Sequence, residues 1–198
     1  AIDFIRESKS IRPDRPFFSY LAWGATHSPH QAPQEYLDKY RGRYDRGWDV
    51  ARQEYFERQI EMGIIPPGTE LAPRNRGVRP WDDLDANEQR LAARLQEAFA
   101  AFLDHTDAQI GRLIDFLESI DELDNTIFIV TSDNGPEPSN PVAELGFTTW
   151  MNLHGYTRDV ENLGEQGSYA FIGPEWALAA AAPFNLFKFY ASEGGLRV

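Results

Sequence analysis

The hydrophobic pattern of the chain centres on one long stripe and the short apolar run that follows it. Between Asp85 and Ile120, the stripe positions recur at spacings of three and four residues, which predicts one long amphipathic helix. These positions are Leu91, Leu95, Phe99, Phe102, Thr106, Ile110, Leu113 and Leu117. Residues 127–130 are all apolar and mostly β-branched, which predicts a strand buried on both faces. A helix that leads into a buried strand is typical of layered α/β proteins.

The rest of the pattern predicts shorter elements of both kinds. Helices are expected over residues 1–8, 34–40, 49–62 and 176–182. Strands are expected over residues 17–23 and 168–173, where apolar and aromatic side chains gather.

Three stretches follow neither period. Residues 63–81 carry four prolines and three glycines, which predicts an irregular surface excursion. Residues 142–167 mix glycine, asparagine and threonine with large aromatic side chains, and we expect a long packed loop there. Residues 186–190 form an apolar run that a single charged residue, Lys188, interrupts.

Composition narrows the class of protein. A chain of 198 residues with 42% hydrophobic residues can fold around a sizeable core. The net charge of −12 argues against nucleic acid or an anionic membrane as partner, so an anionic ligand would need a local cationic pocket. Because the chain has no cysteine, disulfides, thiolate metal sites and cysteine nucleophiles are excluded for it. No apolar run is long enough to span a bilayer.

The two ends of the sequence are abrupt. Ala1 opens what reads as the tail of a helix, with neither an initiator methionine nor a signal peptide. We therefore expect a piece of a larger protein, and the sequence does not indicate a compartment.

Polar side chains with possible chemistry occur at three places. His27 follows the strand predicted over 17–23, and Asp133 and Asn134 follow the strand predicted over 127–130. Carboxylate and amide oxygens are ligands that Ca²⁺ and Mg²⁺ prefer, and ligands of open α/β sheets gather where strands end. Brought together with Lys188, these residues would surround one anion with a cation, a proton donor and an ammonium group. Such a set stabilises a transferring phosphoryl or sulfuryl group.

Two of these three places, Asp133-Asn134 and Lys188, also have an ordinary structural interpretation. Asp-Asn-Gly after a strand is a common turn, and a lysine in an apolar run can extend its tip to solvent. Asp104, His105 and Asp107 in the long helix could form a metal site, but structural hydrogen bonds are the favoured interpretation. Of three further residues, His30 is expected to have a structural role or to support a neighbouring site residue, His154 to lie at the surface, and Arg197 to pack and form an ion pair.

Four blocks of the sequence resemble the sulfatase family, in particular the bacterial arylsulfatases. Residues 17–33, ending Ala25-Thr26-His27-Ser28-Pro29-His30-Gln31-Ala32-Pro33, are similar to the histidine segment of that family. Residues 107–117 resemble the helix before the metal strand, and residues 124–135 resemble the metal strand itself. Residues 161–197, which include Lys188, resemble the segment with the sulfate-binding lysine. The blocks occur in the expected order across almost the whole chain.

The resemblance implies a fold and an activity. The fold would be α/β and alkaline-phosphatase-like, a mixed β-sheet flanked by helices, with residues 1–198 forming part of one catalytic domain truncated at both ends. The activity would be hydrolysis of a small-molecule sulfate ester with Ca²⁺, or less readily Mg²⁺. Carried over to this sequence, Asp133 and Asn134 would bind the metal. His27 would contact the sulfate or protonate the leaving oxygen, and Lys188 would bind the sulfate and the bridging oxygen.

The chain also departs from the family pattern. The Cys/Ser-x-Pro-Ser-Arg motif that supplies the formylglycine nucleophile is absent, as is the early pair of aspartates that completes the Ca²⁺ shell. Two ligands cannot satisfy a cation that takes about six to eight oxygens, so the chain alone should be inactive. Two alternatives stay open: a phosphodiesterase or phosphonate monoester hydrolase of the same superfamily, and a non-catalytic binding module.

Overall fold

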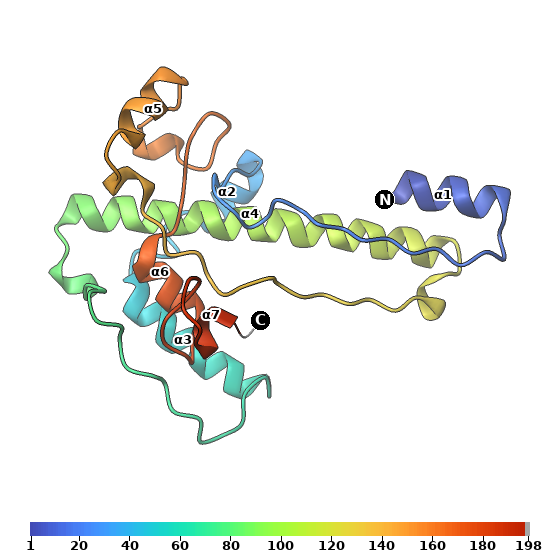
Figure 1. Ribbon diagram of the computed structural model, residues 1–198, viewed down its shortest axis with the longest axis horizontal. Helices are drawn as coiled ribbons and strands as arrows, with labels where there is room; N and C mark the ends of the chain where they lie inside the picture. The colour runs from blue at the N-terminus through green and yellow to red at the C-terminus, as the bar shows by residue number, and fades with distance from the viewer. Residues whose placement is uncertain (197–198) are drawn as a thin grey trace.

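The computed structural model describes residues 1–196, and helices are its dominant elements. One long helix, α4 (Ala86–Ser119), runs along the molecule, and the other elements are arranged around it (Figure 1). The other helices are α1 (Ile2–Ile11), α2 (Gln34–Tyr40), α3 (Gly47–Glu61), α5 (Phe147–Leu153), α6 (Gly173–Ala180) and α7 (Glu193–Leu196). Short 3₁₀ turns occur at Trp81–Asp83, Leu123–Asn125, Pro141–Ala143 and Val160–Asn162. Within the described residues, no helix has the length and apolar character needed to cross a membrane.

The start of α4 is fixed by a complete capping box. The Asp85 side chain accepts hydrogen bonds from the backbone N–H groups of Asn87 and Glu88, and Glu88 accepts from the Asp85 N–H. This arrangement satisfies donors that a helix N-terminus otherwise leaves unpaired. The predicted helix from Asp85 to Ile120 is therefore confirmed, with these two residues as its caps.

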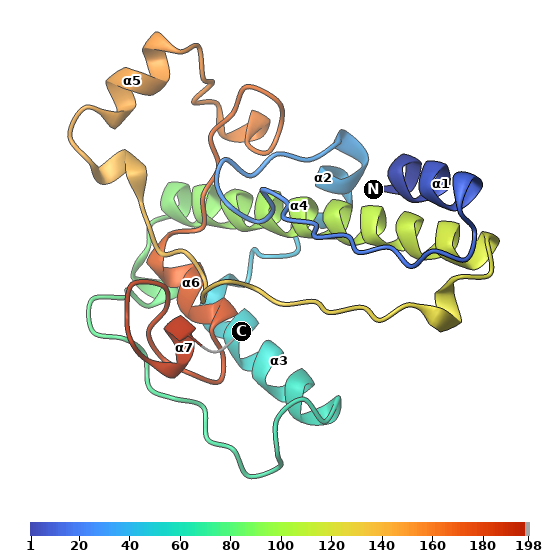
Figure 2. The ribbon, with the colours of Figure 1, turned by 45° about the vertical axis from the view of Figure 1, so that its right-hand side comes forward.

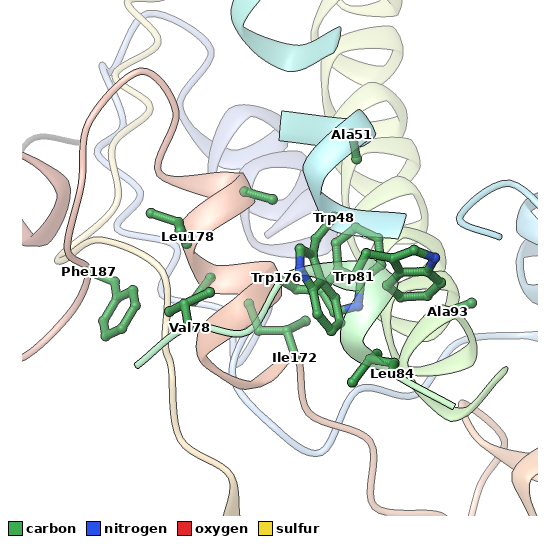
Figure 3. Close-up of a cluster of buried hydrophobic side chains, with 12 residues drawn as sticks. Trp48, Ala51, Val78, Trp81, Leu84, Ala93, Ile172, Trp176, Leu178 and Phe187 are labelled. Atoms are coloured by element: carbon green, nitrogen blue, oxygen red, sulfur yellow. The ribbon is translucent and has the colours of Figure 1, made fainter. Parts of the chain in front are cut away.

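Three small clusters of apolar side chains replace a single core. The largest joins α3, α6 and the 3₁₀ turn at residue 81, where Trp48, Trp81 and Trp176 meet edge to face (Figure 3). A second cluster packs α2 against the middle of α4, around Leu37, and a third packs α1 against the end of α4. Each aromatic pair of this kind contributes about 0.5–1.5 kcal/mol beyond its buried area.

The predicted strands are wrong as far as the described residues show. Residues 17–23, 127–130 and 168–173 contain no β-strand, and one isolated bridge, between Thr157 and Ser168, is the nearest approach to pairing. The segment after α4 runs as a single extended stretch beneath that helix in both views (Figures 1 and 2). Ile127, Ile129 and Val130 are 89%, 86% and 81% exposed, so this segment is not buried on either face. A strand requires a hydrogen-bonding partner, and residues 127–130 make no backbone hydrogen bond to another described segment. The mixed sheet implied by the resemblance therefore does not occur in the described part of the chain.

Two other expectations need correction. The predicted apolar stripe is buried only at Leu95, Leu113 and Leu117, and Leu91 is 40% exposed. The closest packing on α4 involves small residues instead, because Ala98 and Ala101 are fully buried where α2 approaches. The loop predicted over residues 142–167 contains a helix, α5, whose N-cap is Gly146.

The remaining helix predictions are confirmed with shifted ends. The expected helices over 1–8, 34–40, 49–62 and 176–182 correspond to α1, α2, α3 and α6. Residues 63–80 are irregular, as expected, and lead into the 3₁₀ turn at Trp81.

Candidate functional site

The structure brings the segment after Asn134 into direct contact with residues 182–195, which carry Lys188 and are called the Lys188 loop below. The Gly135 N–H donates to the Gly195 carbonyl oxygen at 2.9 Å, and the Lys188 N–H donates to the Pro136 carbonyl oxygen at 3.1 Å. A β-carbon added at Gly135 would lie only 1.9 Å from the Gly194 carbonyl oxygen. The two segments therefore approach as closely as they do because both contact residues are glycine.

The loop around Lys188 has an unusual backbone. Leu186 and Phe189 have φ values of 63° and 81°, in the left-handed region that residues other than glycine rarely occupy. Such conformations cost about 1–3 kcal/mol each and persist only where surrounding contacts impose them. Here the side-chain oxygen of Asn75 accepts a hydrogen bond from the Leu186 N–H at 2.9 Å, and Asn75 is 8% exposed.

The irregular segment 63–80 and helix α3 donate hydrogen bonds to the first residues of the same loop. The Ala72 N–H donates to the Pro183 carbonyl oxygen at 2.9 Å. From α3, the Arg52 guanidinium donates to the Phe184 carbonyl oxygen and the Gln59 amide to the Ala182 carbonyl oxygen, both at 3.0 Å. The excursion predicted from the prolines is thus a support for the lysine loop.

The Lys188 side chain forms an ion pair with Glu137. The ammonium Nζ lies 2.8 Å from Glu137 Oε2, and both side chains are only about one-fifth to one-quarter exposed, at 24% and 21%. The other carboxylate oxygen, Oε1, accepts hydrogen bonds from the Ser139 N–H and hydroxyl. Partial burial alone would raise the pKa of Glu137, but the hydrogen bonds from Lys188 and Ser139 outweigh burial and hold the pKa below its ordinary value.

Asp133 and Asn134 lie directly before this contact. Asp133 is exposed, and Asn134 is half-buried. The Asn134 amide N–H donates to the Gly135 carbonyl oxygen at 2.9 Å, which uses a donor group and not the side-chain oxygen. Two hard oxygen ligands therefore lie two and three residues before the backbone contact between Pro136 and Lys188. Within residues 1–196, however, no three His, Asp or Glu side chains converge into a metal site.

His27 occupies a separate, exposed loop. Its Nδ1 lies 2.9 Å from the Ser28 carbonyl oxygen. The loop is fixed at His30, whose N–H donates to the Ala170 carbonyl oxygen at 3.0 Å, and at Gln31, whose amide donates to the Ser168 carbonyl oxygen. In the part of the chain that the structure describes, no hydrogen bond, ion pair or ring contact joins His27 to the Asp133 or Lys188 segment.

His30 is a core residue. It is 2% exposed, and its ring meets the Phe99 ring edge to face at 5.1 Å. The pKa of His30 is lowered to about 4, mainly by burial; a hydrogen bond with the Thr26 backbone opposes this shift, and the nearby His27 adds a smaller lowering. His30 is therefore neutral at pH 7 and anchors the loop that presents His27, which agrees with the structural role expected for it.

The other candidates have structural partners or lie apart. Asp104 pairs with Lys39 at 2.5 Å, and the His105 ring packs against Tyr36, so two members of the helical trio make the structural contacts favoured from the sequence. His154 ends α5, with Nδ1 2.8 Å from the Trp150 carbonyl oxygen, in an exposed aromatic cluster. Arg197 lies outside the described residues.

Sequence reasoning missed the residues that hold the Lys188 loop in place. These are Asn75, Gly135, Glu137, Gly194 and Gly195. The Gly194-Gly195 pair was the one available signal, because paired glycines often mark a close backbone approach. Together, the contacts place a fixed ammonium beside the segment with two oxygen ligands, an arrangement suited to binding a tetrahedral anion.

The chain spans well under half the length of the known proteins that it matches. An uncharacterized sulfatase of Schizosaccharomyces pombe is 41% identical over 194 residues, which make up 98% of this chain and 35% of that protein. An arylsulfatase of Klebsiella aerogenes is 30% identical over 190 residues, or 95% of this chain and 40% of the relative. An arylsulfatase of Clostridium perfringens is 28% identical over 135 residues, or 68% of this chain and 24% of the relative. The family model described as Sulfatase matches residues 1–198 from end to end, and the chain therefore belongs to the sulfatase family.

Proposed function

We propose that this chain is the acid/base and second metal-ligand part of a sulfuric ester hydrolase of the arylsulfatase type. The observation that carries the proposal is the contact between the Asp133–Glu137 segment and the Lys188 loop, in a chain of the sulfatase family. A sulfate ester has a dispersed negative charge and an oxygen on which further charge develops as the bond breaks. A fixed ammonium beside a divalent cation stabilises both.

The donor set fits Ca²⁺ in part. Asp133 and Asn134 offer a carboxylate and an amide oxygen, the hard ligands that Ca²⁺ takes, and Mg²⁺ takes with stricter geometry. Because Ca²⁺ needs about six to eight oxygens, the remaining ligands would come from a segment outside this chain, together with the formylglycine nucleophile. The cation, when bound, supplies positive charge to the sulfate oxygens.

His27 would supply the proton for the leaving oxygen. Since a carbonyl oxygen only accepts hydrogen bonds, His27 Nδ1 must carry the proton that points to Ser28. The neutral ring then has a lone pair on Nε2, and only the imidazolium can donate there. In this proposal His27 therefore acts as an imidazolium that hydrogen-bonds the ester oxygen.

The exposed extended segments fit the proposed catalytic domain. Phe18, Tyr20, Ile127 and Ile129 are 82% or more exposed, although their side chains are suited to a sheet. We propose that residues 1–198 are part of one α/β domain, in which these segments enter a mixed sheet with strands outside this chain. Without those strands, and without the nucleophile, the chain should be inactive.

Substrate preference tests the proposal against the main alternative. We expect the full-length, matured parent to hydrolyse p-nitrophenyl sulfate with a higher kcat/KM than bis-p-nitrophenyl phosphate or a phenylphosphonate monoester. A clear preference for either phosphorus ester would replace the sulfatase assignment by the phosphodiesterase or phosphonate monoester hydrolase reading. No hydrolysis of any of the three would favour the non-catalytic module.

A further inference from the structure

The ion pair between Lys188 and Glu137 raises a question that the proposed function leaves open. A carboxylate beside an anion-binding ammonium reduces the positive charge available to a sulfate, so its presence requires another benefit. The network around Glu137 indicates what that benefit is: both carboxylate oxygens have partners, Oε1 with Ser139 and Oε2 with Lys188. Glu137 is therefore fixed in one orientation, and a fixed carboxylate can in turn fix the position of the Lys188 ammonium.

We propose that Glu137 is a positioning residue for Lys188, an inference that rests on the proposed function. An ammonium group has three N–H donors. One of them is occupied by Glu137 Oε2 at 2.8 Å, which leaves two for the substrate. Two donors match the two contacts required of Lys188, one to a non-bridging sulfate oxygen and one to the bridging oxygen.

The backbone around the pair supports the same interpretation. Lys188 is held through both its backbone and its side chain: its N–H donates to the Pro136 carbonyl oxygen, and its ammonium pairs with Glu137. Leu186, two residues before Lys188, and Phe189, directly after it, have left-handed backbones, and the Phe189 ring centroid lies 5.6 Å from the ammonium. A flexible lysine side chain is thus restricted on several sides, which lowers the entropy lost when it engages a transition state.

The test is Glu137→Gln in the full-length, matured parent, assayed with p-nitrophenyl sulfate. A glutamine cannot accept hydrogen bonds from Ser139 and Lys188 with separate oxygens, so one of the two partners is lost. Because Lys188 keeps its charge but loses its orientation, we expect kcat to fall about 10- to 100-fold while KM changes less than about threefold. A variant with wild-type kcat would overturn the inference.

A double-mutant cycle separates positioning from a merely structural role. If Glu137 acts through Lys188, Glu137→Gln should cause no further loss of kcat in the Lys188→Ala background. Independent, multiplicative losses would overturn the inference. Ser139→Ala offers a milder variant, should Glu137→Gln fold poorly: loss of one hydrogen bond to Glu137 should lower kcat about 2- to 10-fold.

The chain offers a matched control. Glu122 pairs with Lys9 at 2.6 Å, with side-chain exposures of 19% and 14%, close to those of the proposed pair. Glu122→Gln should therefore cost similar stability and leave kcat unchanged. The inference and the proposed function fail differently: a wild-type parent without sulfatase activity refutes the function, whereas full activity of Glu137→Gln beside an inactive Lys188→Ala refutes the inference alone.

Discussion

Lys188→Ala in the full-length, matured parent should lower kcat/KM for p-nitrophenyl sulfate about 100- to 1,000-fold, the usual loss when one preorganised donor to a developing charge is removed. The structure holds this ammonium in place through Glu137 and the Pro136 backbone. Its contribution should therefore appear mainly in the chemical step. Steady-state kinetics at saturating and limiting substrate would separate the effect on kcat from that on KM.

Two further variants test whether loss of stability, and not loss of the ammonium, lowers the activity of Lys188→Ala. Lys188→Ala leaves Glu137 as an unpaired, partly buried carboxylate, which can destabilise the protein by itself. Lys188→Ala combined with Glu137→Gln removes that charge and should be equally slow. Lys9→Ala breaks the comparable pair with Glu122 and should retain activity. An active Lys188→Ala enzyme would contradict the role given to this lysine.

Gly135→Ala should lower the free energy of unfolding by about 3 kcal/mol, at the upper end of the cost of overpacking. The added β-carbon would lie 1.9 Å from the Gly194 carbonyl oxygen, and backbone atoms cannot move aside as a side-chain tip can. This clash can be relieved only if the two segments separate, which would also move Lys188 away from Asp133 and Asn134. Chemical denaturation and kinetics of the same variant should therefore both show losses.

Gly111→Ala is the matched control for this substitution. Gly111 lies inside α4, and nothing lies within 4 Å of an added β-carbon. Alanine there should stabilise the protein by about 0.5–1 kcal/mol, because glycine is a poor helix residue. If Gly135→Ala were as stable and active as this control, the close backbone contact would have no part in building the site.

The elements predicted correctly are those fixed by local sequence. The period of α4 and its capping residues, Asp85 and Glu88, lie within the helix itself and need no distant partner. The strand predictions were wrong for the opposite reason, since strand pairing depends on segments far away in sequence. Ile127, Ile129 and Val130 have strand composition and an extended path, yet they make no backbone hydrogen bond to another described segment.

The candidate site was predictable only in its chemistry. Asp133, Asn134, His27 and Lys188 stand out because their side chains can bind a metal or an anion. Their spacing along the chain does not reveal that Lys188 contacts the segment after Asn134. The sequence indicates the supporting residues even less clearly. Glu137 is one acidic residue between two prolines, and its importance depends on Lys188, which lies 51 residues later in the sequence. Such partners follow from the fold and not from composition.

Calcium titration of the full-length protein by calorimetry tests the central claim most directly. We expect the wild-type protein to bind Ca²⁺ at one site, and Asp133→Ala to weaken that binding by more than about 100-fold, since even the hydrogen-bonding partners of metal ligands contribute about 10- to 100-fold. Asp107→Ala, which removes an exposed carboxylate on α4, should bind as the wild type does. Absence of Ca²⁺ binding, or binding that Asp133→Ala leaves unchanged, would contradict the account.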